Sequence, residues 1–161
     1  MSAVVRSWAG LILLGLVALF STLAARPLIP VDETRYAAVA WEMWQRGDFL
    51  VPYLNGQPYS HKPPLFFWLI HAGWWLTGVN EWVVRSIAPL VTLATLLATG
   101  RLARRIWPDD AGTAAAAPWV LISCVFLTAF LSWVQIDMLL VLCCVLAMTG
   151  LVMAAREGVY G

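Results

Sequence analysis

The chain is divided into long apolar runs separated by short polar stretches, and the lengths of the runs predict its elements. Four runs are close to the about 20 residues that a helix needs to cross a bilayer. They cover residues 7–25, 82–102, 111–134 and 138–155. A further run at 64–78 is shorter, opens with prolines and contains His71 and Gly73. We therefore expect it to form an interfacial or re-entrant helix within an outer loop, 26–81.

The first apolar run has a second interpretation. The small residues of "STLAA" near its end would also suit the cleavage site of a signal peptide. A single basic residue, Arg6, precedes the run, and the run is long for a signal. These features favour a retained helix.

A polar stretch after this run has the period of an amphipathic helix over residues 34–46. Its apolar side chains fall at offsets typical of one helix face: Tyr36, Val39, Ala40, Met43 and Trp44. Gly47 then provides a stop, and an extended segment with the turn signal Asn55-Gly56 follows. Such a helix is suited to lie in the membrane interface.

Orientation follows from the basic cluster "RLARR" at 101–105, which is expected on the cytoplasmic side. With four spans, Asp32 and Asp137 then face the same outer side. If 64–78 were a fifth span, the two carboxylates would lie on opposite sides. The four-span arrangement therefore predicts that Asp32 and Asp137 meet.

Composition supports an all-α integral membrane protein. The 161 residues are 61% hydrophobic and 12% charged, which is too apolar for a soluble domain of this size. The net charge of +1 argues against nucleic acid as a partner. As partners of an integral membrane protein, membrane lipids are expected. Cys124, Cys143 and Cys144 lie in apolar runs, so we expect buried free thiols and no disulfide framework.

The charged residues next to the runs are candidates for chemistry. Asp32 and Glu33 could start the helix that follows, or act as a general base or cation ligand at the membrane boundary. Lys62, held extended by the prolines after it, suits a phosphate, although a lysine that snorkels near anionic lipid would look the same. Asp137 could cap the last run, yet an ionisable group at the end of a span is costly unless it is wet or paired.

Three further residues are open to more than one interpretation. His61 could bind a metal or donate a proton, but a lone histidine more often does neither, and His71 is weaker still. Arg85 could snorkel outward, or pair with Asp32, Glu33 or the phosphate of a ligand. The sequence has no glycine-rich phosphate loop, no HExxH and no pair of cysteines at metal-ligand spacing.

Taken in order, the motifs resemble the bacterial protein-mannosyltransferase-like glycosyltransferases, and among them the aminoarabinose lipid A transferases. The segments that carry the resemblance are "DETRYAAVAWEMWQRGDFLVPYLNGQPYSHKPPLFFWL", "GVNEWVVR" and "IDMLL". Within the first are Asp32-Glu33, Arg35-Tyr36, Gly47-Asp48, Pro52, Asn55-Gly56 and Lys62 to Leu65. The resemblance covers residues 28 to about 145.

This resemblance implies the N-terminal part of a GT-C membrane fold that uses a polyprenyl-phosphate-linked sugar. The acceptor would be lipid A, another envelope glycolipid or glycan, or a protein. By position, Asp32 and Asp137 would be catalytic, and Lys62 and Arg85 would lie near the donor phosphate. The supporting residues would be Glu33, Arg35, Tyr36, Tyr59 and His61. The active face would be periplasmic, or extracellular in a cell with one membrane.

Two departures from the family pattern affect these expectations. The family often has an acid where this chain has His61, which weakens the case for a divalent metal. Its members are also several times longer, so we expect a fragment or a truncated gene product that would be inactive by itself. The alternatives are an inactive protein that binds polyprenyl phosphate or partners a full-length transferase, and a small transporter, for which the spans lack internal charges and symmetry.

Overall fold

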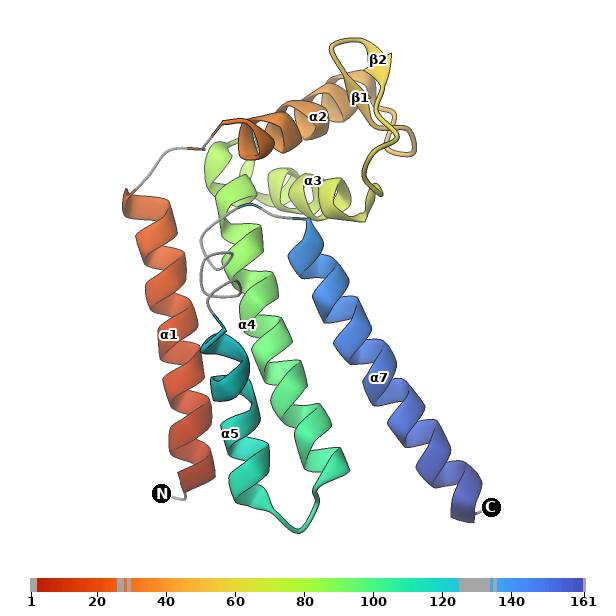
Figure 1. The fold of residues 1–161 in the computed structure, drawn as a ribbon. Coiled ribbons are helices and arrows are strands. Elements are labelled where there is room, and N and C mark those ends of the chain that lie inside the picture. The colour runs from red at the N-terminus through yellow and green to blue at the C-terminus, as the bar shows by residue number, and fades with distance from the viewer. Residues whose placement is uncertain (1–2, 26–27, 29, 125–133, 135, 161) are drawn as a thin grey trace.

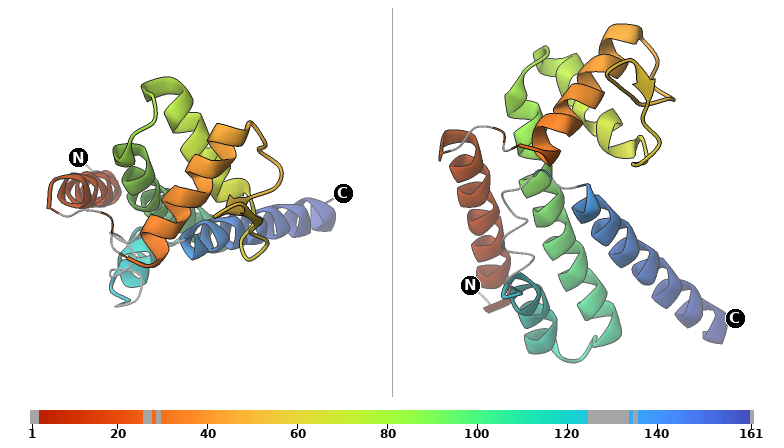
Figure 2. Two further views of the ribbon diagram at one scale, coloured as in Figure 1. Left: turned by 90° about the horizontal axis from the view of Figure 1, so that it is seen from above. Right: turned by 45° about the horizontal axis from the view of Figure 1, so that its top comes forward.

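The protein is almost entirely helical. The structure, a computed structural model, describes residues 3–25, 28, 30–124, 134 and 136–160 (Figure 1). Its long helices are α1 (Ala3–Ala25), α4 (Glu81–Ile106) and α7 (Asp137–Tyr160), and the short helix α5 (Ala111–Ile122) contacts α1 and α4. Two further helices, α2 (Asp32–Arg46) and α3 (Leu65–Thr77), lie across one end of this group (Figures 1 and 2). Helix α4 is central, because it contacts α1, α5 and α7.

Helix α2 follows the apolar period that the sequence shows. It begins two residues earlier than predicted, with Asp32 and Glu33 in its first turn, where negative charge favours the helix dipole. It ends at Gly47, whose φ of 66° is a left-handed conformation that suits glycine. The apolar face that starts at Tyr36 is buried against α3 rather than left free for the membrane interface, and Trp44 is half-buried.

The predicted turn at Asn55-Gly56 is confirmed and forms a short hairpin. Strands β1 (Tyr53–Leu54) and β2 (Gln57–Pro58) pair antiparallel, and both turn residues have positive φ, 54° and 79°. The backbone N–H of Gly56 donates to Glu42 of α2 at 2.8 Å, and Arg46 donates to the same carboxylate oxygen at 2.9 Å. The hairpin is therefore fixed to the C-terminal half of α2.

Helix α3 joins α2 to the central helix. Phe66, Phe67 and Ile70 are buried in the same cluster as Tyr36. At its end, the indole N–H of Trp74 donates to the carbonyl of Asn80 at 2.7 Å, and the Asn80 side chain accepts from the backbone of α4 at 3.0 Å. This capping bond satisfies a backbone N–H in the first turn of α4.

The predicted end of one helix and the predicted burial of the cysteines need correction. Helix α4 continues to Ile106, four residues beyond the predicted end, and stops just before Trp107-Pro108. Helix α5 ends at Ile122, and most of the rest of the predicted run 111–134 lies outside the described residues. The expected burial of the cysteines is wrong, because all three thiols are free but exposed. Apolar side chains on a membrane helix can face lipid and need no protein interior.

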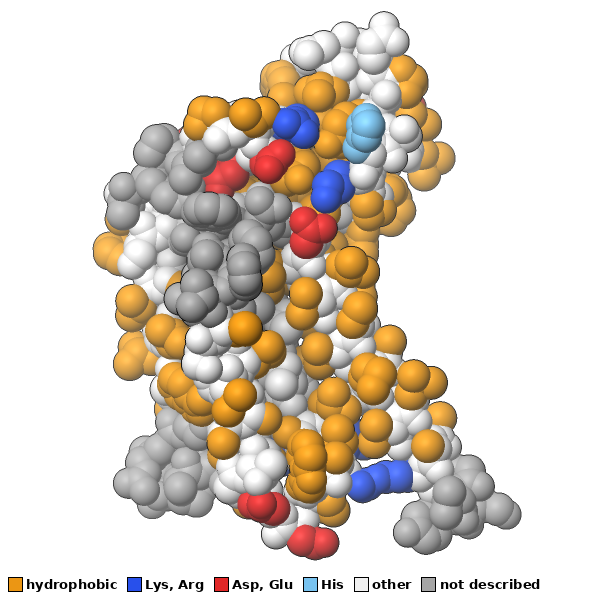
Figure 3. Space-filling view, in the orientation of Figure 1, with side chains coloured by type: hydrophobic (Ala, Val, Ile, Leu, Met, Phe, Trp, Pro, Cys, Tyr) orange, Lys and Arg blue, Asp and Glu red, His pale blue; other side chains and the backbone are white. Residues whose placement is uncertain are grey.

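Side-chain distribution agrees with a membrane protein. Helix α4 and residues 137–156 of α7 are long and apolar enough to cross a bilayer, whereas 8–24, α3 and α5 are shorter apolar helices. On the face shown in Figure 3, charged side chains gather at the two ends of the molecule, and a band without them lies between. One charged end lies beneath α2, and it contains the candidate site.

Candidate functional site

A polar cavity of about 500 Å³ lies between α2, the hairpin, the segment before α3 and the start of α7. Its lining residues are Asp32, Arg35, Tyr36, Leu54, Tyr59, His61, Lys62 and Asp137. All but Leu54 were candidates from the sequence. The expectation that Asp32 and Asp137 lie on the same face is confirmed, since both line this cavity.

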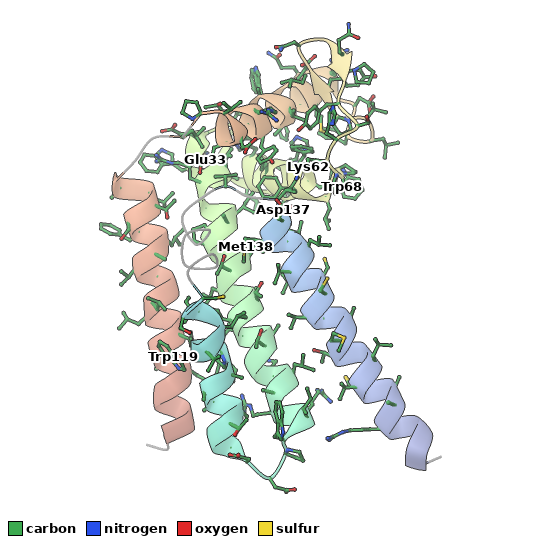
Figure 4. The ribbon with its side chains drawn as sticks, viewed as in Figure 1. Glu33, Lys62, Trp68, Trp119, Asp137 and Met138 are labelled. Carbon is green, nitrogen blue, oxygen red and sulfur yellow. The ribbon has the colours of Figure 1, made fainter. Side chains whose placement is uncertain are left out.

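Lys62 and Asp137 form an ion pair at one edge of the cavity. Nζ of Lys62 lies 3.4 Å from Oδ1 of Asp137, with the two side chains 28% and 64% exposed (Figure 4). Lys62 is followed by two prolines, the second of which is the N-cap of α3. Asp137 is the first residue of α7. The positions of both residues are therefore determined by helix N-termini, and their charged groups remain accessible to a ligand.

The opposite wall is formed by the first turn of α2. Arg35 lies 3.5 Å from Asp32, one turn away, so the Asp32 carboxylate has a cation beside it. Tyr36 is 2% exposed, and burial, together with the carboxylates of Asp32 and Asp137 and the Tyr59 phenol, raises the pKa of Tyr36 to about 12. Its phenol is therefore protonated at neutral pH and can donate a hydrogen bond into the cavity.

An apolar groove of about 300 Å³ adjoins the polar cavity. It is lined by Lys62, Pro63, Leu65, Phe66, Ile136, Asp137, Leu139, Leu140 and Cys143. Lys62 and Asp137 belong to both linings, so the ion pair stands where the polar and apolar spaces meet. This arrangement suits an amphiphile whose charged group is flanked by a polar part on one side and a hydrocarbon chain on the other.

Two of the candidate residues lie elsewhere. Glu33 is 4% exposed, and its Oε1 accepts from the backbone N–H of Val134 at 2.8 Å. Arg85 is 3% exposed and does not snorkel; it donates to the carbonyl of Leu23 at 3.0 Å and lies 3.9 Å from Glu81. Neither side chain lines the polar cavity among the described residues.

The histidines differ in their surroundings. His61 lies in the cavity wall, with its ring centroid 5.3 Å from that of Tyr59. His71 is buried between α2 and α3, with Nε2 2.9 Å from the carbonyl oxygen of Ala40, and burial lowers the pKa of His71. In the described part of the chain, no three His, Cys, Asp or Glu side chains are grouped as metal ligands.

Comparison with known proteins identifies the family. Residues 61–160 match the family model described as dolichyl-phosphate-mannose-protein mannosyltransferase. The chain belongs to this family. The resemblance drawn from the sequence motifs is thereby confirmed.

Individual relatives extend the match toward the N-terminus. Two proteins named undecaprenyl phosphate-alpha-4-amino-4-deoxy-L-arabinose arabinosyl transferase are similar to the chain. The one from Edwardsiella ictaluri is 37% identical over 109 residues, which are 68% of this chain and 19% of the relative. The one from Serratia proteamaculans is 36% identical over 139 residues, which are 85% of this chain and 25% of the relative. The chain thus spans about a quarter or less of these relatives.

Solved structures share the fold. ArnT from Cupriavidus metallidurans bound to undecaprenyl phosphate superposes with a TM-score of 0.79 at 28% sequence identity, covering 93% of this chain and 29% of that one. The apo state of the same protein gives a TM-score of 0.81, covering 98% of this chain and 30% of the other. The chain therefore has the helical membrane architecture of a GT-C enzyme, over the region that it spans.

Proposed function

We propose that the chain is the N-terminal part of a glycosyltransferase that moves a sugar from a polyprenyl-phosphate donor to lipid A or another envelope acceptor. The observation that carries this proposal is the position of the Lys62–Asp137 pair between the polar cavity and the apolar groove. A donor of this class has a sugar, a phosphate and a hydrocarbon chain in that order. The names of the similar proteins point to the same class of donor.

Lys62 and Asp32 would have separate roles in the transfer. Transfer breaks the bond between the sugar's anomeric carbon and the phosphate oxygen, so negative charge develops on the departing polyprenyl phosphate. Lys62 would stabilise that charge as a cation. Asp32 would take the proton from a hydroxyl acceptor as the new bond to the anomeric carbon forms. An acceptor that is already an ionised phosphate would need no base.

The remaining residues of the polar cavity would bind and orient the sugar. Arg35 lies beside Asp32 and would orient that carboxylate through their ion pair. The phenols of Tyr36 and Tyr59 and the ring of His61 would supply hydrogen bonds to sugar hydroxyls. Asp137 pairs with Lys62 and would turn to the substrate where a donor phosphate takes its place beside the lysine. Arg85, outside the cavity, would support the fold near α1 rather than contact phosphate.

The same proposal places the chain in the inner membrane as a single domain. Four spans, within residues 7–25, 82–102, 111–134 and 138–155, would place α2 and α3 in the outer interface and the cavity on the periplasmic side. The band without charges in Figure 3 supports this arrangement, as do Arg101, Arg104 and Arg105 at the end of α4 away from the cavity. Exposed tryptophans on α3, at Trp68 and Trp75, would lie in the headgroup layer.

The proposal can be tested in cells that carry or lack the gene. Mass spectrometry of the envelope glycolipids should show a sugar addition that disappears when the gene is deleted and returns with the wild-type gene. Asp32→Asn should insert in the membrane normally but fail to restore the addition. If the lipid profile is the same with and without the gene, the chain is not part of such a transferase. If the addition requires the chain but not Asp32, a lipid-binding role without catalysis is the better account.

A further inference from the structure

Glu33, next to the proposed base Asp32, points away from the cavity. Successive residues of an α-helix are rotated by about 100° around its axis, so neighbouring side chains reach different surroundings. Asp32 faces the polar cavity, whereas Glu33 is 4% exposed and faces the protein. The two adjacent acids therefore have different roles.

The buried Glu33 carboxylate is bonded to the segment that leads into α7. Its Oε1 accepts from the backbone N–H of Val134 at 2.8 Å, across 101 residues of sequence. Val134 itself is fully buried, three positions before Asp137. A polar group buried in this way is costly unless hydrogen bonds compensate, and the Val134 N–H supplies one.

This bond connects the start of α2 to a residue just before α7, and the starts of α2 and α7 are the two parts of the cavity wall that are farthest apart in the sequence. The residue before Glu33 is Asp32, and Val134, which bonds to Glu33, stands three positions before Asp137 in the sequence. Ile136 and Met138, on either side of Asp137, are buried at 6% and 2% exposure, so the start of α7 is packed as well as bonded. The labelled side chains in Figure 4 show Glu33 at the start of α2 and Asp137 at the start of α7.

We propose that Glu33 is a positioning residue that fixes the start of α7, and with it Asp137, relative to Asp32. The bond to Val134 requires a hydrogen-bond acceptor on the side chain of residue 33 and involves no proton transfer. Its significance for sugar transfer rests on the proposed function, but the structural link itself does not. The proposal therefore predicts that changing the carboxylate to an amide is tolerated at Glu33 and abolishes glycolipid formation at Asp32.

A distance measurement tests the link without activity. Spin labels would be placed at the exposed positions Gln45 and Met148, with the native cysteines replaced by alanine, in the full chain reconstituted in lipid nanodiscs. Wild type and Glu33→Gln, which retains an acceptor oxygen, should give the same narrow distance distribution. Glu33→Leu, which has a similar volume and no acceptor, should broaden it. An unchanged distribution in Glu33→Leu, or one in Glu33→Gln as broad as in Glu33→Leu, would overturn the proposal.

The gene-complementation assay adds a functional readout. Glu33→Gln should restore the glycolipid, whereas Asp32→Asn should not, and Glu33→Leu should lower the yield about a hundredfold, as a misplaced catalytic group does. If Glu33→Gln is as inactive as Asp32→Asn, the charge of Glu33 is needed and the positioning role is wrong. If even the wild-type gene gives no glycolipid, the proposed function fails, and the spin-label result alone decides the link.

Discussion

Nζ of Lys62 lies 3.4 Å from Oδ1 of Asp137, although 75 residues separate the two in sequence. Asp137 is 64% exposed, so water screens this pair, and exposed pairs contribute about 0–1 kcal/mol to stability. The contact is therefore too weak to account for the fold. Its value lies in holding a cation and a carboxylate together where a phosphate could replace the carboxylate as the partner of the lysine.

We expect Asp137→Asn to lower the free energy of unfolding by less than about 1 kcal/mol. The substitution removes one charge of an accessible pair and leaves the packing of α7 unchanged. Thermal unfolding in detergent, compared with wild type, measures this directly. Glycolipid formation in the complementation assay should nevertheless fall, because Asp137 lines the cavity. A large loss of stability would mean that the pair is structural.

The contact between α3 and α4 depends on a glycine. A Cβ at Gly73 would collide with the branched side chain of Val83 in α4, which cannot move easily. We expect Gly73→Ala to destabilise the protein by about 1–3 kcal/mol, the usual cost of overpacking. Gly150→Ala is the matched control, since nothing lies within 4 Å of a Cβ there. Equal effects of the two substitutions on the unfolding temperature would contradict this account of the α3–α4 contact.

Tyr36 should make stability depend on pH in the alkaline range. Burial in particular raises its pKa in the folded protein to about 12 from an ordinary value of 10.0. Between these values the folded state keeps a proton that the unfolded state releases. The stabilisation is therefore complete below pH 10 and is lost as the pH rises from 10 toward 12.

The measurement is the free energy of unfolding of wild type and Tyr36→Phe across that range. Phenylalanine has the same ring and cannot ionise, so the variant should lose less stability than wild type as pH rises. The difference should be on the order of 1–3 kcal/mol for a shift of this size. Parallel curves for the two proteins would show that Tyr36 ionises equally in both states.

Local patterns in the sequence predicted much of the fold. The 3.6-residue period beginning at Tyr36 predicted the apolar face of α2, and Asn55-Gly56 predicted the turn that the hairpin contains, because both depend on residues close in the chain. The grouping of Asp32, Lys62 and Asp137 came from the parity of the predicted spans and from the family resemblance. Neither spacing nor composition alone could have placed Lys62 beside Asp137.

Contacts between distant segments were harder to predict from the sequence. Glu33 accepts from a backbone N–H 101 residues away, and a backbone group has no signature in the sequence. The burial of Arg85 had one available signal, since Glu81 stands four residues before it on the same helix face. The exposed cysteines had none, because an apolar side chain in a membrane helix can face either lipid or protein.

The most direct test of the central claim is equilibrium binding of undecaprenyl phosphate to the full chain in lipid nanodiscs. Wild type should bind it and should not bind undecaprenol, which lacks the phosphate. Lys62→Met should weaken binding about 10- to 100-fold, as expected for loss of a hydrogen bond to a charged group worth about 1.5–3 kcal/mol, whereas Lys62→Arg should retain most of the affinity. Equal affinity of wild type and Lys62→Met, or equal binding of phosphate and alcohol, would contradict the assignment of this cavity as a phosphate site.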